Sequence, residues 1–108
     1  MESRWLEDFL SLVDTRNFSR SAEIRCTTQP AFSRRIKNLE EWVGAQLFNR
    51  ATQPTSLTPA GERFRPVADE VLRHLYQGRK DAARVNDIFV NTIRFAAPHG
   101  LSLTFFPK

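Results

Sequence analysis

The stretch that decides the fold is residues 28–50, TQPAFSRRIKNLEEWVGAQLFNR. Thr28 is a helix-capping residue type, and Pro30 follows in the first turn, where its missing N–H costs little. Gly44 is placed to end the helix. Between them, apolar residues recur at the three- and four-residue spacing of one buried helix face. These apolar residues are Phe32, Ile36, Leu39 and Val43. The stretch therefore predicts an amphipathic helix that runs into a short strand.

The opposite face of this helix is basic and carries hydrogen-bonding side chains in its first turns, namely Gln29, Ser33 and Arg34. A helix with one packing face and one polar face at its N-terminus is typical of the recognition helix of a helix-turn-helix protein. Within residues 15–38, six basic residues stand against one acid, although the whole chain has a formal net charge of only +4. This local excess favours a nucleic-acid partner over an ordinary solvated helix face.

Two shorter helices are predicted before this stretch. Apolar residues at helical spacing predict the first over about residues 4–16, with Ser3 as its cap. The second is predicted over about residues 20–26, with Ser19 as its cap. The two helices and the recognition helix together give the order of a helix-turn-helix domain.

A wing and a long helix follow. Residues 47–50 and 55–57 flank a polar turn and predict two short strands. Thr58 is a helix-capping residue and Pro59 follows it at the first helical position, so a helix is predicted over residues 59–90. Its apolar seam alternates spacings of four and three, which favours pairing with another helix over packing on its own domain. The seam residues expected to form a dimer are Phe64, Ala68, Val71, Leu75, Ala82 and Val85.

The chain of 108 residues is expected to be mainly α, with a winged helix-turn-helix domain over residues 1–58. Residues 92–97 are predicted to form a strand, and a strand without a partner is not stable by itself. Residues 91–108 are therefore interpreted as the start of a second, α/β domain.

Few features suggest chemistry. Cys26 is the only cysteine, which excludes an internal disulfide and fits a reducing compartment. We expect it to pack as a small residue at the end of the second helix, with a redox switch as the alternative. No catalytic set, metal-binding spacing, signal peptide or membrane span is recognisable in the sequence. The sequence therefore predicts a cytoplasmic binding protein that is not an enzyme and binds no metal.

The chain contains, in this order and spacing, Phe9, NFSRSAE at 17–23, TQPAFSRRI at 28–36, Leu39-Glu40, Gly44, LFNR at 47–50 and LTPAG at 57–61. Together these residues resemble the DNA-binding half of a LysR-type transcriptional regulator. The stretch APHGLSL at residues 97–103 also resembles the hypochlorite-responsive branch of that family. Arg25 and Thr27 depart from the family pattern, which usually has apolar residues there, so Ile24 is expected to serve the core instead. The wing turn is less basic than is usual in the family.

The resemblance implies a bacterial regulator that binds duplex DNA in two half-sites, as a dimer through the long helix and as a tetramer at full length. It implies a further domain that senses a small molecule or an oxidant, and no cofactor in the residues present here. A rival interpretation is a protein-interaction module whose basic face is only solvated and whose long helix docks a partner.

The first turns of the recognition helix are where the family meets the major groove. Gln29 can pair with an adenine edge and Arg34 with guanine O6 and N7. Base reading is thus expected from Gln29, Pro30, Ser33 and Arg34, and phosphate contacts from Ser19, Thr28, Arg35 and Arg50. Gln53 and Pro54 would form the tip of the wing.

Overall fold

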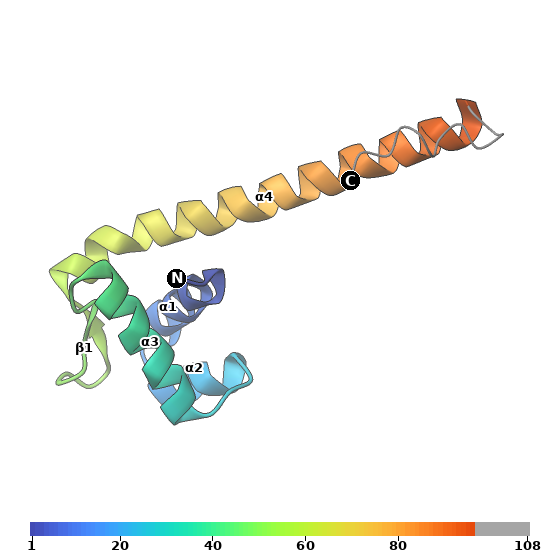
Figure 1. The fold of residues 1–108 in the computed structure, drawn as a ribbon. Helices are drawn as coiled ribbons and strands as arrows, with labels where there is room; N and C mark the ends of the chain where they lie inside the picture. The colour runs from blue at the N-terminus through green and yellow to red at the C-terminus, as the bar shows by residue number, and fades with distance from the viewer. Residues whose placement is uncertain (97–108) are drawn as a thin grey trace. The chain divides into compact units, whose positions relative to one another are not determined.

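The computed structural model describes residues 1–96, with side chains up to Ile93. Three helices come first, α1 (Ser3–Thr15), α2 (Phe18–Ile24) and α3 (Gln29–Val43) (Figure 1). Two strands, β1 (Phe48–Asn49) and β2 (Ser56–Leu57), and the helix α4 (Pro59–Ala96) follow. The chain divides into two units, residues 1–73 and residues 74–108. The expectation of a mainly α, winged helix-turn-helix fold with a long helix is confirmed.

The core of the first unit lies between α1, α3, the wing and the first turns of α4. Phe9 is its centre, with ring centroids 5.3 Å from both Phe48 of β1 and Phe64 of α4. Burial of these apolar side chains is the main force that holds the helices together. The other buried apolar residues are Leu6, Leu12, Ala22, Phe32, Ile36, Leu39, Leu47, Ala68 and Leu72.

The caps of the helices agree with the sequence in part. Thr28 Oγ1 accepts a hydrogen bond from the backbone N–H of Ala31 at 3.2 Å, and Gly44 ends α3 with a left-handed φ of 90°, both as predicted. The predicted cap at Ser19 is wrong, because α2 begins earlier and Asn17 Oδ1 accepts from the N–H of Arg20 at 3.0 Å. Ser3 is likewise the first residue of α1, and not its cap.

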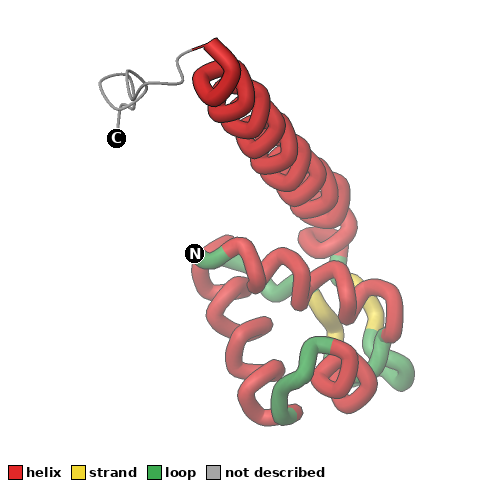
Figure 2. The backbone as a smooth tube through the Cα atoms, turned by 90° about the vertical axis from the view of Figure 1, so that its right-hand side faces the viewer, coloured by secondary structure: helices red, strands yellow, loops and turns green. Residues whose placement is uncertain are grey.

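The two strands form a small antiparallel wing, with Phe48 opposite Leu57 and Asn49 opposite Ser56 (Figure 2). Helix α4 begins two residues after the end of β2 and passes close to Leu47, the residue that precedes β1. A Cβ atom added at Gly61 would collide with the backbone carbonyl of Leu47. Glycine is therefore required at this crossing of helix and wing.

Helix α4 continues beyond the predicted end at residue 90 and runs to Ala96. The predicted strand at residues 92–97 is therefore wrong over residues 92–96. These residues include no glycine or proline, and the part of the chain that the structure describes offers them no partner strand. A helix satisfies their backbone hydrogen bonds locally. The expected start of an α/β domain, over residues 91–108, is therefore helical as far as Ala96, and its remainder, residues 97–108, lies outside the described residues.

Ile24 does not serve the core, contrary to expectation, and 53% of its surface is exposed. It follows Ala22, which is buried, by two positions, so its side chain lies on the far side of α2. Cys26 was expected to pack at the end of this helix, but it is exposed and has a left-handed φ of 57°. The alternative interpretation, a redox switch, is not tested by this exposure.

Candidate nucleic-acid interface

Helix α3 has one face in the core and one face in solvent. Phe32, Ile36 and Leu39 are fully buried. Of the four residues predicted to read bases, Gln29, Pro30 and Arg34 are exposed and Ser33 is half-buried. The helix therefore carries the predicted base-reading set on a surface that the rest of the domain leaves largely uncovered.

Gln29 is the first residue of α3 and has a partner in α2. The hydroxyl of Ser19 donates a hydrogen bond to Gln29 Oε1 at 2.8 Å. Ser19 was predicted to be a cap and a phosphate contact, and the structure engages its hydroxyl with Gln29 instead. The bond joins the first turns of the two helices of the helix-turn-helix unit.

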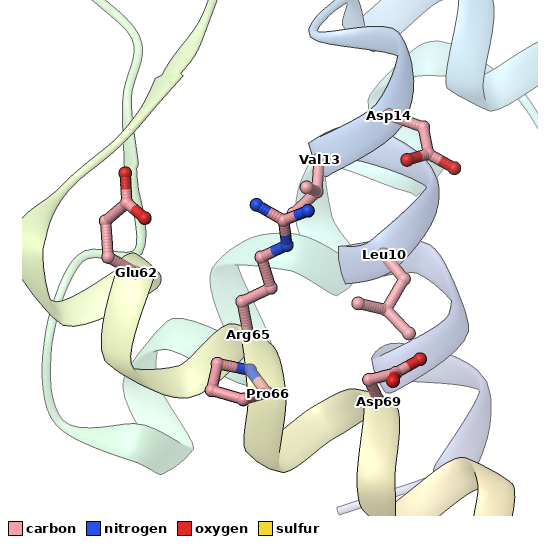
Figure 3. A pocket seen from close by; sticks show the side chains of 7 residues that line it. All are labelled: Leu10, Val13, Asp14, Glu62, Arg65, Pro66 and Asp69. Atoms are coloured by element: carbon pink, nitrogen blue, oxygen red, sulfur yellow. The ribbon is translucent and has the colours of Figure 1, made fainter.

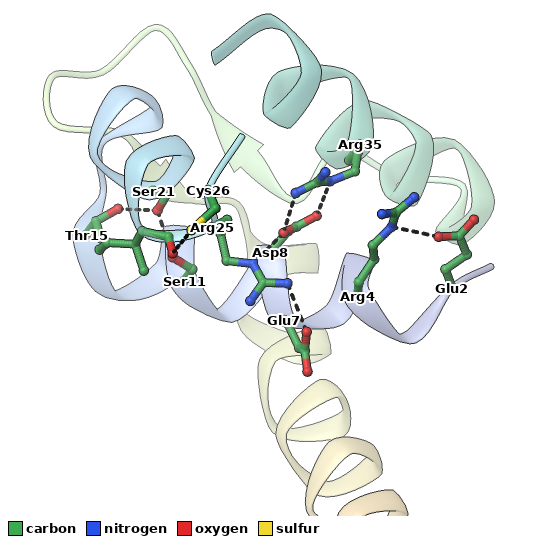
Figure 4. A network of polar contacts seen from close by, with 11 residues as sticks. Glu2, Arg4, Glu7, Asp8, Ser11, Thr15, Ser21, Arg25, Cys26 and Arg35 are labelled. Atoms are coloured by element: carbon green, nitrogen blue, oxygen red, sulfur yellow. Dashed lines mark hydrogen bonds and ion pairs between the residues drawn. The ribbon is translucent and has the colours of Figure 1, made fainter. Parts of the chain in front are cut away.

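Arg34 and Arg35 are adjacent in the sequence but have different surroundings. The Arg34 side chain is exposed. Arg35 lies about 100° further round the helix and points to α1, where its Nε donates to Asp8 Oδ2 at 2.7 Å and its second terminal nitrogen to Asp8 Oδ1 at 3.1 Å (Figure 4). Arg35 was predicted to contact phosphate, but its guanidinium is bound by a carboxylate of the same domain.

Asp8 is the fully buried centre of this network, which the sequence analysis did not identify. Besides Arg35, it accepts a hydrogen bond at 2.7 Å from Nε of Arg25, the residue that follows α2. Arg25 also donates to Glu7 at 2.9 Å. The arginine that departs from the family pattern therefore pairs with α1, and one carboxylate ties α1 to both helices of the helix-turn-helix unit (Figure 4).

The charge of Arg25 is stabilised by its surroundings. Partial burial alone would lower the pKa of its guanidinium, because it disfavours the charged form. The hydrogen bonds to Asp8 and Glu7, and their negative charges, outweigh this effect and raise the pKa above its ordinary value. Arg25 is therefore held in its charged state.

A second buried carboxylate, Glu40 of α3, fixes the start of the wing. Its Oε2 accepts hydrogen bonds from the backbone N–H groups of Leu47 at 2.8 Å and Phe48 at 3.1 Å. Its Oε1 accepts from Arg50 at 3.1 Å. The guanidinium of Arg50 also lies 5.2 Å from the ring centroid of Phe18, a cation–π distance. Arg50, predicted to contact phosphate, is thus held in place by protein contacts and remains partly exposed.

The tip of the wing is exposed and organised by its own polar groups. Gln53 and Pro54, the predicted tip residues, are both exposed and are joined by a cis peptide bond. The hydroxyl of Thr52 lies within hydrogen-bond distance of the backbone carbonyls of Asn49 and Pro54, at 3.2 and 2.9 Å. The wing tip is available for contact, and its binding to DNA stays a prediction.

The predicted dimer seam divides into two groups. Phe64 is half-buried beside Phe9 and Ala68 is fully buried, so these two residues serve the core of the first unit and not a partner. Val71 and Leu75 are 45% and 49% exposed, and Val85 is 65% exposed. Ala82 is exposed as well. Val67 and Ile88 are further exposed apolar residues of α4, at 51% and 59%.

A groove of about 610 Å³ lies between α1 and the first turns of α4 (Figure 3). None of its lining residues belongs to α3, so it is separate from the predicted base-reading surface. The structure, as far as residue 96, contains no cluster of histidine, cysteine or acidic residues that could hold a metal ion. No helix in this range is long and apolar enough to cross a membrane. The groove between α1 and α4 is lined by Leu10, Val13, Asp14, Glu62, Arg65, Pro66 and Asp69.

Comparison with known proteins agrees with this geometry. The HTH-type transcriptional regulator YjiE of Escherichia coli (strain K12) is 40% identical over 108 residues, which are 100% of this chain and 36% of YjiE. The crystal structure of Vibrio fischeri DarR in complex with DNA matches with a TM-score of 0.80 and 45% identity, over 82% of this chain and 30% of DarR.

HypT from Salmonella typhimurium, described as a hypochlorite-specific LysR-type transcriptional regulator, matches with a TM-score of 0.72 and 44% identity. The match covers 76% of this chain and 28% of HypT. This chain spans about a third of the length of these proteins. The family described as "Bacterial regulatory helix-turn-helix protein, lysR family" matches residues 3–62, more than half of the chain. The chain therefore belongs to the LysR family of bacterial helix-turn-helix regulators.

Proposed function

We propose that this protein binds duplex DNA sequence-specifically, with α3 in the major groove of a promoter half-site. The observation that carries the proposal is the division of α3 into two faces. Asp8 and Arg35 fasten one side to α1, while Gln29 and Arg34 are exposed. The match to DarR, solved in complex with DNA, supports the same use of the fold.

The base contacts follow from the chemistry of the exposed side chains. Arg34 can donate two hydrogen bonds to O6 and N7 of a guanine, and Gln29 can pair with the edge of an adenine. Pro30 and Ser33 lie on the same surface and would contact a thymine methyl group or a polar base edge. Thr28 and the exposed part of Arg50 are the proposed phosphate contacts, which fix the position of the helix on the duplex.

The proposed active form is a dimer that reads two half-sites. Its support is the exposed apolar residues that recur along α4, with Val71, Leu75, Ala82 and Val85 on the predicted seam. A row of this kind on a helix is usually covered by another helix. The proposed full-length protein is a cytoplasmic transcriptional regulator and a tetramer, whose missing part senses a small molecule or an oxidant.

The test is selection of random duplex DNA by the chain and by two variants. We expect the wild-type chain to enrich a dyad-symmetric motif, and Arg34→Ala to lose preference at one base pair of each half-site. The affinity for the selected duplex should fall by about 1–3 kcal/mol. Arg79→Ala removes an exposed arginine of α4 outside the seam and serves as the matched control.

The rival function, a protein-interaction module, predicts a different dependence on salt. DNA binding releases counterions and weakens steeply as salt rises, whereas docking through an apolar seam changes little. If the chain bound no duplex even at low salt, the DNA-binding proposal would be refuted and the interaction module favoured. Salt-sensitive binding without any enriched motif would refute sequence-specific reading by this part of the protein.

A further inference from the structure

We propose that Ser19 is a positioning residue for base recognition, whose hydroxyl holds the side-chain amide of Gln29 in one orientation. The proposal rests on the function proposed above and refines it. Ser19 does not cap α2, because Asn17 performs that role. Its hydroxyl is therefore free to donate to Gln29 Oε1, at 2.8 Å across the turn between the two helices.

The two backbone segments that carry this bond are themselves fixed. The first turn of α2 is capped by Asn17, and the first turn of α3 is capped by Thr28. Phe18 and Phe32, in the first turns of the same two helices, pack edge to face with ring centroids 6.0 Å apart. The Ser19–Gln29 bond thus joins two ordered segments, and it orders a side chain that would otherwise rotate freely in solvent.

The direction of the bond decides what Gln29 presents to DNA. The hydroxyl of Ser19 occupies one of the two lone pairs of Oε1. The Nε2 group has no hydrogen-bond partner among residues 1–96, so its two donors remain available. An amide held in this way offers a donor to N7 of a purine and keeps one lone pair for the N6 amine of adenine. The reversed amide would instead place its oxygen where the Nε2 donors now lie, an arrangement that suits the N4 amine of cytosine.

Ser19 therefore contributes to specificity without touching a base. Without the hydroxyl, Gln29 has to be ordered during binding and can adopt both amide orientations. Ordering one long side chain at an interface weakens binding by roughly 2- to 10-fold. We expect Ser19→Ala to reduce the preference for a purine at the base pair read by Gln29 by about this factor.

The experiment is a double-mutant cycle with Ser19→Ala, Gln29→Ala and the combined variant. Affinity is measured for the selected duplex, for the same duplex with cytosine at the position read by Gln29, and for one with the corresponding 7-deazapurine, which lacks the N7 acceptor. Ser19→Thr retains a hydroxyl and is the rescue variant. Thermal unfolding of each variant checks the fold, and Ser19→Ala should leave it unchanged because the residue is exposed and Asn17 supplies the cap.

We expect the loss on 7-deazapurine to be largest for the wild-type chain and for Ser19→Thr, smaller for Ser19→Ala, and absent in both variants that lack Gln29. In the Gln29→Ala background, Ser19→Ala should have no further effect. If Ser19→Ala instead weakened every duplex equally, with or without Gln29, the hydroxyl would contact phosphate and the inference would be overturned. A Ser19→Ala chain with the wild-type preference would also overturn it, although DNA binding itself would stand.

Discussion

Replacing Asp8 by asparagine should destabilise the domain strongly, because this one buried carboxylate forms ion pairs with two arginines. It accepts three hydrogen bonds, from Nε of Arg25 and from two nitrogens of Arg35, at 2.7–3.1 Å. Asparagine preserves the shape but removes the charge. It also turns an N–H group toward a guanidinium that can only donate. Arg35 is then left without its counter-charge at the junction of α1, α2 and α3, and Arg25 keeps only Glu7.

The size of the effect follows from the burial of the three partners. Breaking a buried ion pair by removal of one partner costs about 3–5 kcal/mol. Asp8 is fully buried, but the side chains of Arg25 and Arg35 keep 26% and 18% of their exposure and can regain some hydration. We therefore expect a loss of about 3 kcal/mol in the free energy of unfolding, at the lower end of that range. For a domain of this size, the melting temperature should fall by roughly 12–24 °C.

Urea and thermal unfolding followed by circular dichroism measure this loss. Asp14→Asn is the matched control, because Asp14 is an exposed aspartate on the same helix. Its change should stay within about 0.5 kcal/mol of the wild-type value. If Asp8→Asn were within 1 kcal/mol of wild type in both experiments (about a fivefold change in the folding equilibrium), the network would not stabilise the domain as argued here.

The contribution of Arg25 to the free energy of unfolding depends on pH in a direction that can be predicted. Its folded-state pKa is raised, so its contribution is complete at every pH below its unfolded-state pKa. The contribution is lost only as the pH rises through the folded-state pKa, in strongly alkaline solution. We therefore expect that Arg25 stays charged between about pH 6 and pH 10. Its titration should not change the difference in free energy of unfolding between wild type and Arg25→Leu over this range.

Three other predictions test separate parts of the structure. Glu40→Gln should lower the free energy of unfolding by about 2 kcal/mol, measured in urea, because the amide retains one acceptor for the wing but turns a donor to Arg50. Arg35→Ala should lower the melting temperature and Arg34→Ala should not, and equal effects on stability would contradict the assignment of Arg35 to the fold. Leu75→Asp should weaken the dimer by roughly tenfold or more in light scattering, since a charge would be buried in the seam. A wild-type chain that is already monomeric at high concentration would refute the dimer.

The parts of the fold that depend on neighbouring residues were predictable from the sequence. Helix α3 was one of these, because its cap, its apolar spacing and its terminal glycine all lie within residues 28–44. The cap of α2 was predicted wrongly, at Ser19 instead of Asn17. Asn17 and Ser19 are both good capping residues two positions apart, and only the extent of the helix distinguishes them.

The ion pairs of the interior were not predicted, because their partners are distant in the chain. Arg35 and Asp8 are separated by 27 positions, so Arg35 was predicted to contact phosphate and its pairing with Asp8 was missed. A signal was nevertheless present. Asp8 lies on the apolar face of α1, next to Phe9 and four positions before Leu12, and Glu40 lies four positions after Ile36 on the buried face of α3. An acid at a core position indicates a buried partner.

The seam of α4 shows a similar limit of pattern analysis. The heptad spacing correctly identified one apolar row, but spacing alone does not say what covers each part of the row. Phe64 and Ala68 are covered by their own domain, whereas Val71 and Leu75 are exposed. Only the three-dimensional arrangement of α1 and the wing separates the two groups.

Arg34 is exposed and Arg35 is bound within the domain, and this difference affects how such a regulator could acquire new target sites. Arg35 belongs to a closed network, so its replacement disturbs three helices at once. Arg34 is exposed, and substitution of an exposed residue usually changes stability by less than about 0.5 kcal/mol. Under selection for a different operator, the residue at position 34 could therefore change freely, while Arg35 at position 35 keeps α3 in place against α1. With Arg34 in its proposed base-reading role, specificity could thus change one position away from Arg35, which is fixed by its contacts with α1.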